Sequence, residues 1–184
     1  MVRQIIDTTT ETNIWGDTKV VKKIKDEMFC DTIQLSKSES FLAKGERNDC
    51  VVRAFMVTLD VSYDIAHKWV KKMFKRQDRK GTYTSRYLSD VIGRVKNGKK
   101  LTMMGWCPKY AYGEEKKKQL LTNPKYKKIT GYTVKSFMEQ HPKGRYFIIV
   151  KGHALGLVDG VLYGNKSEQY EGFRRHVHYV VKIG

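Results

Sequence analysis

The hydrophobic positions follow two patterns, helical spacing in the first half of the chain and strand-like runs in the second. Residues 18–29 predict a surface helix, because four apolar side chains recur at helical spacing among lysines and acidic residues. Residues 62–76 show the same amphipathic pattern, and residues 84–95 predict a further helix. Residues 30–45 indicate a loop or a short strand.

Residues 50–59, CVVRAFMVTL, are apolar almost all round, which is typical of a helix inside a core. Asn48 and Asp49 stand directly before it and are natural helix caps. We expect the Asp49 side chain to turn away from Cys50 and to cap this helix. Arg53 is the one charged residue of the segment, and we expect it to pair with a carboxylate or with carbonyls.

The second half of the sequence predicts mainly strands. Residues 101–106 indicate a strand, and residues 133–140 a short helix capped by its first threonine. Residues 145–165 predict a buried strand and then a hairpin that turns at Asp159-Gly160, and residues 174–184 a final strand. A helix-rich first part followed by an antiparallel, strand-rich second part is an α+β arrangement.

Length and composition predict one domain over residues 1–184. A chain of this length usually forms a single domain, and 40% hydrophobic residues with 11 Tyr, 7 Phe and 3 Trp can fill a core. We place an N-terminal extension, with the surface helix, at residues 1–44 and the core at residues 45–184. Residues 108–130 form a basic insertion in that core, expected to be mostly exposed, whose glycine, asparagine and proline argue against one long helix.

The charge balance points to an acidic partner. Lys and Arg number 36 against 19 Asp and Glu, for a net charge of +17. Nucleic acid is the first partner to consider at this charge, followed by an acidic protein or an anionic membrane surface. Side chains of the insertion could follow phosphates and stack on a base. They are Lys116, Lys117, Lys118, Lys125, Lys127, Lys128 and Tyr126. A solvated basic face is the alternative for each group.

Cysteine usage indicates a reducing compartment. Cys30, Cys50 and Cys107 are odd in number and far apart, without a CxxC pair or a Cys/His spacing suited to zinc. We therefore expect no disulfide framework, no structural metal and no cofactor. The N-terminus lacks the apolar core of a signal peptide, and no run approaches the ~20 apolar residues of a membrane span. We expect a soluble intracellular protein, or one carried in a particle.

Cys50 has the position of a nucleophile, because the first turn of a helix presents unpaired N–H groups that favour the thiolate. A base is needed, and His153 is best placed, since it follows a buried strand and a glycine. His67 lies among lysines of an amphipathic helix and is expected at the surface or its boundary. His176 and His178 share one face of a strand but lack an obvious third metal ligand.

The hairpin can close in two registers, which place different residues opposite His153. A two-residue Asp159-Gly160 loop puts Lys166 opposite His153 and turns Asn165 to the other face. A three-residue loop with Gly160 as the bulge residue pairs His153 with Asn165, close enough for the amide to orient the imidazole. We favour the three-residue loop. It also puts the leucines at 155 and 157 on the face that packs against the central helix.

A resemblance enters at these residues. NDCVVRAF and GRYFIIVKGHALGLVDGVLYGN resemble motifs of the papain-like cysteine peptidase superfamily, in particular small phage and bacterial proteins distantly related to bacteriocin-leader peptidases. The first motif is also similar to DGNCLFRA of ovarian-tumour-type deubiquitinases. The resemblance covers about 130 residues, from the region of Gly45 to Tyr170, although its specific part is the two short motifs. It implies a papain-like fold in which the central buried helix packs on an antiparallel sheet.

The resemblance also implies roles for individual residues. Cys50 would be the nucleophile, His153 the general base and Asn165 the residue that orients the imidazole. Papain-like enzymes carry a glutamine six residues before the cysteine, and here that position is Lys44. Asn48 and the backbone N–H of Cys50 are then the remaining oxyanion donors.

These expectations give one leading function and two alternatives. The first is a cysteine peptidase or amidohydrolase, phage-encoded, that cleaves an amide or isopeptide bond of a peptide or protein in the host cytoplasm or the virion. The second is an inactive phage accessory or virion protein that binds nucleic acid or a host protein through its basic surface. The third is a host-directed inhibitor that acts by binding alone. In the latter two cases Cys50 and His153 would be ordinary core residues.

Overall fold

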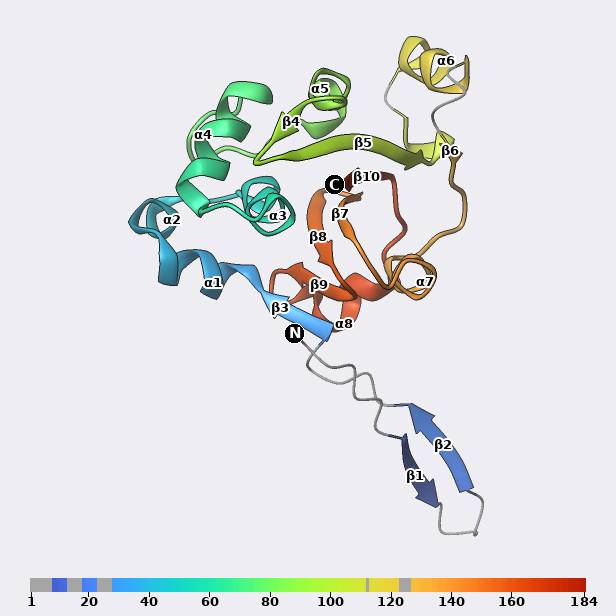
Figure 1. Cartoon of the computed structure of the whole chain (residues 1–184). Helices are drawn as coiled ribbons and strands as arrows, with labels where there is room; N and C mark the ends of the chain where they lie inside the picture. The colour runs from blue at the N-terminus through green and yellow to red at the C-terminus, as the bar shows by residue number, and fades with distance from the viewer. Residues whose placement is uncertain (1–7, 13–17, 23–27, 112, 123–126) are drawn as a thin grey trace.

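The computed structural model describes residues 8–12, 18–22, 28–111, 113–122 and 127–184, and its centre is an eight-stranded mixed sheet (Figure 1). The strand order is β3-β9-β8-β7-β10-β5-β4, with β6 beside β5. Two pairs, β3 with β9 and β5 with β6, are parallel and the others are antiparallel. The strands are β3 (Phe29–Asp31), β4 (Val95–Lys96), β5 (Lys99–Trp106), β6 (Lys127–Lys128), β7 (Arg145–Val150), β8 (His153–Val158), β9 (Val161–Gly164) and β10 (Tyr179–Ile183).

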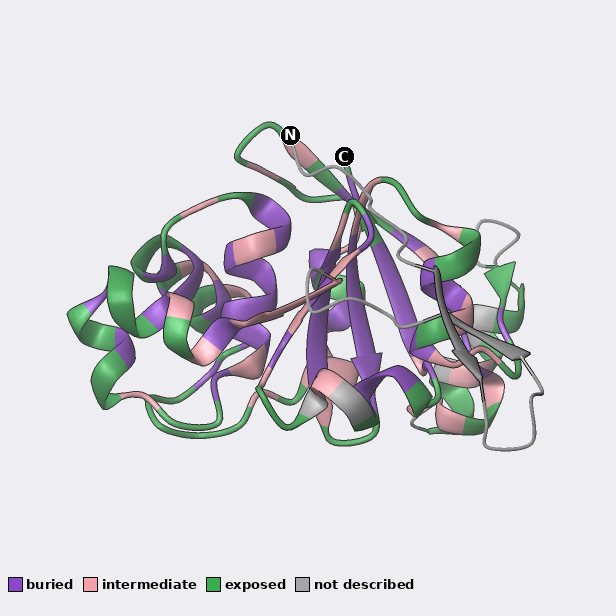
Figure 2. Cartoon of the chain, turned by 90° about the horizontal axis from the view of Figure 1, so that it is seen from below, coloured by how far each residue is buried: buried purple, intermediate pink, exposed green. Residues whose placement is uncertain are grey.

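Helices cover both faces of this sheet, and Figure 2 shows the buried strands lying between them. Five helices come before the first long strand: α1 (Thr32–Glu39), α2 (Phe41–Gly45), α3 (Cys50–Leu59), α4 (Tyr63–Met73) and α5 (Thr84–Val91). Later in the chain come η2 (Pro108–Tyr110), α6 (Glu114–Thr122), α7 (Val134–Gln140), α8 (Glu168–Glu171) and η3 (Gly172–Arg174). No helix in the described ranges is both long and apolar enough to cross a membrane. The helices and the sheet are consistent with the expected α+β class, but the sheet is mixed and not antiparallel throughout as expected, because β3 and β6 join it in parallel.

The central helix α3 forms where the sequence predicts it and packs directly on β8. Eight of its residues are buried, in agreement with its nearly continuous apolar surface. Gly156 of β8 permits the close approach, because a Cβ there would lie 2.5 Å from the Val57 Cγ2 atom. The Phe55 ring stacks on Phe147 of β7, with ring centroids 4.2 Å apart. These contacts hold α3 against β7 and β8.

The sheet separates two cores. Side chains of α3, α4 and α5 pack with one face of β5, β7, β8 and β10. Side chains of α7 pack with the opposite face, where Leu155 and Leu157 lie. The prediction that these two leucines contact α3 is therefore wrong. Ala154 and Gly156 face α3 instead, because alternate residues of a strand point to opposite faces.

The first part of the chain differs from its predicted structure. Residues 18–22 form strand β2 (Thr18–Lys22), antiparallel to β1 (Thr8–Thr12), so the predicted surface helix over 18–29 is wrong. Thr18, Val20 and Val21 are β-branched, which favours a strand. Residues 23–27 lie outside the described residues. The core also starts before residue 45, because β3 joins the main sheet beside β9.

The hairpin between β8 and β9 closes with a two-residue loop. Val158 pairs with Val161 and Leu157 with Leu162, so the predicted three-residue register is wrong. Asp159 and Gly160 have φ values of 47° and 84°, as a type I′ turn requires. Asp tolerates this left-handed conformation, and its carboxylate accepts a 2.8 Å hydrogen bond from the Gly144 N–H. The two-residue loop is thereby stabilised, and Asp159 is a turn residue as expected.

Candidate active site

Cys50 is the first residue of α3. Contrary to the prediction, the side chain of its neighbour Asp49 does not cap the helix. Asp49 occupies the N-cap position without a side-chain capping bond. Its buried carboxylate instead accepts hydrogen bonds from the Arg53 Nε atom at 3.0 Å and from the Tyr63 hydroxyl at 2.7 Å. Arg53 is paired with a carboxylate, as expected from the sequence. The N–H groups of the first turn therefore remain available beside the thiol.

His153 is the first residue of β8 and lies at the same cleft as Cys50. The backbone N–H of Ala154, the next residue, acts on the Cys50 sulfur in the direction that lowers the pKa of the thiol. Both Cys50 and His153 line a cleft of about 1000 Å³. The cleft lies between residues of α1, the α2–α3 connection and the 77–85 segment on the helical side and the ends of β7 and β8 on the sheet side. Cys50 and His153 thus line one cavity, but alternation along β8 puts the His153 side chain on the face of Leu155 and Leu157, opposite to α3. No hydrogen bond joins the two residues within the described part of the chain.

The electrostatics favour an uncharged thiol and an uncharged imidazole. Burial raises the pKa of the Cys50 thiol, although the Ala154 N–H and the Arg53 guanidinium act in the opposite direction. Burial, assisted by the positive charges of Arg175 and Arg53, lowers the pKa of His153 to about 4. The helix N-terminus was expected to lower the thiol pKa, but burial outweighs it here. Near neutral pH the pair is therefore thiol and neutral imidazole.

Asn165 does not orient His153. β9 ends at Gly164 and diverges from β8 after the Gly156–Tyr163 pair, so Asn165 is not opposite the histidine. The Asn165 Oδ1 atom accepts a 2.8 Å hydrogen bond from Arg53. Among the described residues, no hydrogen bond joins His153 to Asn165, and the buried His153 Nε2 atom has no partner. The His–Asn pair expected from the sequence is therefore replaced by an Arg–Asn pair.

Arg53 is the centre of a buried polar network, which the sequence did not reveal as a site element. Its Nη1 atom donates to the Thr32 hydroxyl at 3.1 Å as well as to Asn165. Thr32 in turn donates to the carbonyl of Gly164 at 2.9 Å. The network joins α1, α3 and the end of β9. In the sequence, the only signal for this network was an arginine within an otherwise apolar helix. It predicted a carboxylate partner for Arg53 but not the contact with Asn165.

Two further residues of the cleft bear on its chemistry. Asn48, the candidate oxyanion donor, is exposed, lines the cleft and has a left-handed φ of 53°; its role stays a prediction. His178 also lines the cleft, and its ring stacks on Tyr110 with centroids 3.5 Å apart. The cleft thus holds a second histidine in the part of the chain that the structure describes.

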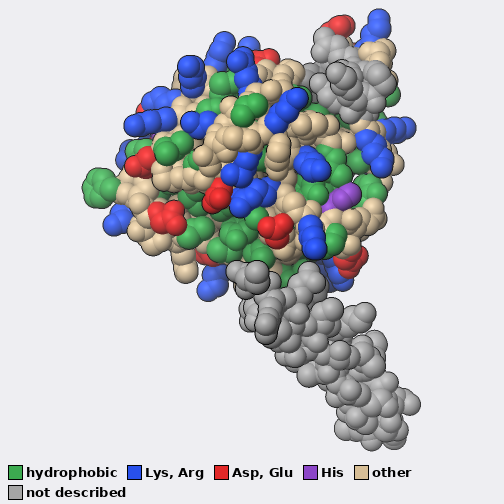
Figure 3. All heavy atoms as spheres, in the orientation of Figure 1, with side chains coloured by type: hydrophobic (Ala, Val, Ile, Leu, Met, Phe, Trp, Pro, Cys, Tyr) green, Lys and Arg blue, Asp and Glu red, His purple; other side chains and the backbone are tan. Residues whose placement is uncertain are grey.

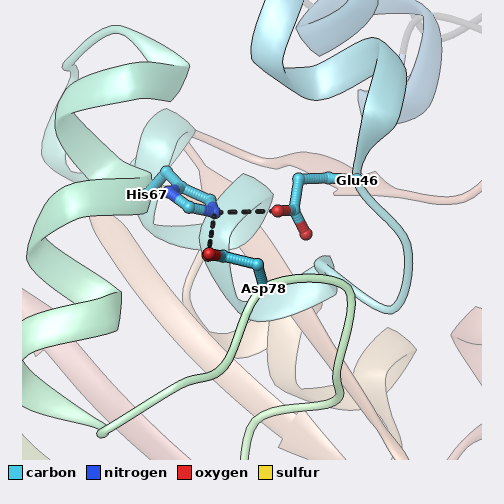
Figure 4. Close-up of side chains that lie close together, drawn as sticks. All are labelled: Glu46, His67 and Asp78. Carbon is cyan, nitrogen blue, oxygen red and sulfur yellow. Dashed lines mark hydrogen bonds and ion pairs between the residues drawn. The ribbon is translucent and has the colours of Figure 1, made fainter.

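His67 is buried, which corrects the prediction of a surface or boundary position. Figure 4 shows its imidazole pointing to Glu46 and Asp78, with 3.2 Å from Nε2 to the Glu46 carboxylate. These three residues have the geometry of possible metal ligands. However, Arg76 contacts the same two groups, at 2.6 Å from Glu46 and 3.1 Å from His67. A guanidinium already supplies the positive charge, so the donor set does not fit a metal ion.

Apart from Tyr110, no described residue of the basic insertion lines the cleft. Lys118, Lys127 and Lys128 are exposed, and Lys117 approaches Glu114 at 3.6 Å. Lys125 and Tyr126 lie outside the described residues, and the side chain of Lys116 is not described. Figure 3 shows Lys and Arg side chains scattered over one face with Asp and Glu between them. On that face there is no continuous basic track, and nucleic-acid binding by the insertion stays a prediction.

Comparison with known proteins gives no relative for this chain, since no family model, curated protein or solved structure matches it.

Proposed function

We propose that the protein is a papain-like cysteine peptidase or amidohydrolase, with Cys50 as nucleophile and His153 as general base. The observation that supports this most is that both residues line one cleft, with Cys50 at the first turn of a buried helix. Thiol acyl transfer needs a thiol and a base at one substrate cleft. The phage origin suggested by the two sequence motifs belongs to the same proposal.

The reaction starts from the uncharged pair. As the Cys50 sulfur attacks the carbonyl carbon of the scissile amide, its proton passes to the imidazole of His153. The tetrahedral intermediate collapses with loss of the amine, which takes the proton from the imidazolium. Water, deprotonated by the neutral imidazole, then hydrolyses the thioester and regenerates the thiol. The Cys50 backbone N–H and Asn48 are the candidate donors to the oxyanion.

Proton transfer does not require Asn165 in this proposal. The buried Nε2 atom of His153 has no hydrogen-bond partner among the described residues. In this proposal the imidazole is therefore positioned by packing and by the backbone of β8. A carbonyl group or an ordered water that accepts a hydrogen bond from Nε2 would fix the tautomer needed for general base catalysis.

A peptidyl electrophile tests the proposal. We would treat the wild type and the Cys50→Ala and His153→Gln variants with a peptidyl acyloxymethyl ketone and follow adducts by intact mass. We expect one adduct, at Cys50, and a rate at least about 100-fold lower in His153→Gln, the usual contribution of a general base. Cys30 and Cys107 are internal controls. Equal labelling of Cys30, or a rate indifferent to His153, would contradict the proposal.

The second candidate is an inactive binding protein with the same fold. The raised pKa of Cys50 and the missing His153–Asn165 contact favour it. It predicts no adduct at Cys50 and partner binding that survives Cys50→Ala.

A further inference from the structure

The exposed charges around the cleft are all basic. Six charged residues line it, and two of them, Glu46 and Asp49, are acidic. Arg76 pairs with Glu46 at 2.6 Å, and Arg53 pairs with Asp49 at 3.0 Å. Both carboxylates are therefore already compensated by arginines. The cleft lining described by the structure has no exposed carboxylate.

Three basic side chains of the lining are exposed: Lys37, Arg47 and Lys80. None of the three side chains has an ion pair within the described part of the chain. They come from α1, the α2–α3 connection and the segment after α4. We call these three residues the basic rim.

The backbone segments that carry two members of the basic rim are joined through Glu46. The Arg79 N–H donates to Glu46 at 3.0 Å, and the Arg79 Nε atom donates to the Gly45 carbonyl at 3.2 Å. Arg47 follows Glu46 in the chain and Lys80 follows Arg79, so two exposed cations stand on neighbouring segments at the cleft. Two cations on neighbouring segments attract a negative group.

Unpartnered polar atoms add to this site. The Thr82 hydroxyl, in the segment that carries Lys80, is buried and has no hydrogen-bond partner among the described residues. A buried polar group of this kind costs stability unless a ligand or solvent satisfies it. A hydroxyl can donate to a carboxylate.

We propose that the cleft binds acidic peptides, with the basic rim pairing with carboxylates on the substrate beside Cys50. This inference names the substrate class of the proposed peptidase site and rests on that function. A peptide fits better than nucleic acid, because three cations around a cleft of about 1000 Å³ do not form the extended track that a phosphate backbone follows. The scattered basic residues of Figure 3 agree with this choice.

Binding is measured with the full chain carrying Cys50→Ala, so that no turnover interferes. The probes are fluorescein-labelled peptides of equal length that alternate Ala with Glu, Gln or Lys, read by anisotropy. We expect the Glu peptide to bind at least roughly tenfold tighter than the Gln peptide. The triple variant Lys37→Gln, Arg47→Gln, Lys80→Gln should lose this preference.

The matched control neutralises three exposed lysines outside the cleft, Lys68→Gln, Lys72→Gln and Lys143→Gln, and should keep the preference. Equal losses in the two triple variants would mean general charge attraction and would overturn the inference. Equal affinities for the Glu and Gln peptides would overturn it too, as would oligothymidylate competing better than the Glu peptide. Circular dichroism checks that each variant folds.

Failure of this inference is distinguishable from failure of the proposed function. The electrophile experiment depends on Cys50 and His153, whereas the binding experiment uses Cys50→Ala and depends on the basic rim. An adduct at Cys50 without a preference for the Glu peptide would leave a peptidase of other specificity. The reverse result would leave a protein that binds acidic peptides without cleaving them.

Discussion

The Nη1 atom of Arg53 donates a hydrogen bond of 2.8 Å to the Oδ1 atom of Asn165, across 112 positions of the sequence. This contact joins α3 to the residue after β9 and fixes the asparagine at the cleft. It also uses the oxygen that would otherwise be free to accept a proton from His153. Because Arg53 binds Asn165, the candidate catalytic pair is Cys50 and His153, and Asn165 belongs to the polar network around Arg53.

Asn165→Ala tests this assignment. We expect the rate of electrophile reaction at Cys50 to stay within about threefold of wild type, because no hydrogen bond joins Asn165 to His153 among the described residues. Stability should fall by about 2 kcal/mol, since a charge-assisted hydrogen bond of buried Arg53 is lost. Urea denaturation and labelling rates are the two measurements. A loss of rate comparable with that of His153→Gln would show that Asn165 orients the imidazole after all.

Alkylation of Cys50 by iodoacetamide should have a midpoint above that of an ordinary thiol, about pH 8.5. Burial raises the pKa of Cys50, so the reactive thiolate forms only at higher pH. The rate at Cys50 is followed by peptide mass spectrometry over a pH series. The same chain in denaturant is the control and should return to the ordinary midpoint. A native midpoint well below 8 would mean that the pair is thiolate and imidazolium.

Protonation of His153 should weaken the fold in mild acid. Its folded pKa of about 4 lies below the usual value, so the unfolded chain binds this proton first as pH falls. The stabilisation is complete above about pH 6.5 and is lost as pH falls towards about 4. We expect the decrease in free energy of unfolding between about pH 7 and pH 5 to be smaller in His153→Gln, as measured by urea denaturation. An unchanged decrease would argue against a buried neutral imidazole.

Gly156→Ala should destabilise the protein by about 1 to 3 kcal/mol, the usual cost of overpacking a core. The added Cβ would lie 2.5 Å from the Val57 Cγ2 atom and 3.4 Å from the Ala54 carbonyl oxygen. Thermal unfolding of the variant measures the effect. Gly81→Ala is the matched control, because no atom lies within 4 Å of its added Cβ, and it should be close to neutral. A loss in Gly156→Ala no larger than that in Gly81→Ala would mean that α3 and β8 can move apart at little cost.

The local pattern of the sequence was sufficient for most elements that bury an apolar face. Residues 50–59 formed α3, Thr133 caps α7, and Asp159-Gly160 forms the turn of the hairpin. These features depend on side chains close in sequence, such as a cap or a turn residue, and on burial of a continuous apolar surface. The same patterns placed Cys50 at a helix start and His153 at a strand start.

Residues 18–29 show where the local pattern failed. Their apolar spacing suits a helix, whereas β-branched residues at 18, 20 and 21 suit a strand, and pairing with β1 decided the outcome in favour of β2. The prediction that His67 lies at the surface failed for a related reason. The lysines beside it indicated a solvent-facing helix surface, but Glu46, 21 residues before it, and Arg76, nine residues after it, provide the partners that make its burial possible.

The sequence by itself determined the α+β class, the buried central helix and the candidate pair Cys50 and His153, because each follows from the chemistry of a short segment. Tertiary structure alone decided the partners of that pair. The hairpin loop has two residues instead of the expected three. Because the register sets which way every later residue faces, Asn165 lies at Arg53 and not opposite His153. Burial in the packed core likewise raises the pKa of Cys50 and outweighs the helix N-terminus, which favours the thiolate. Burial depends on the tertiary structure and not on the local sequence.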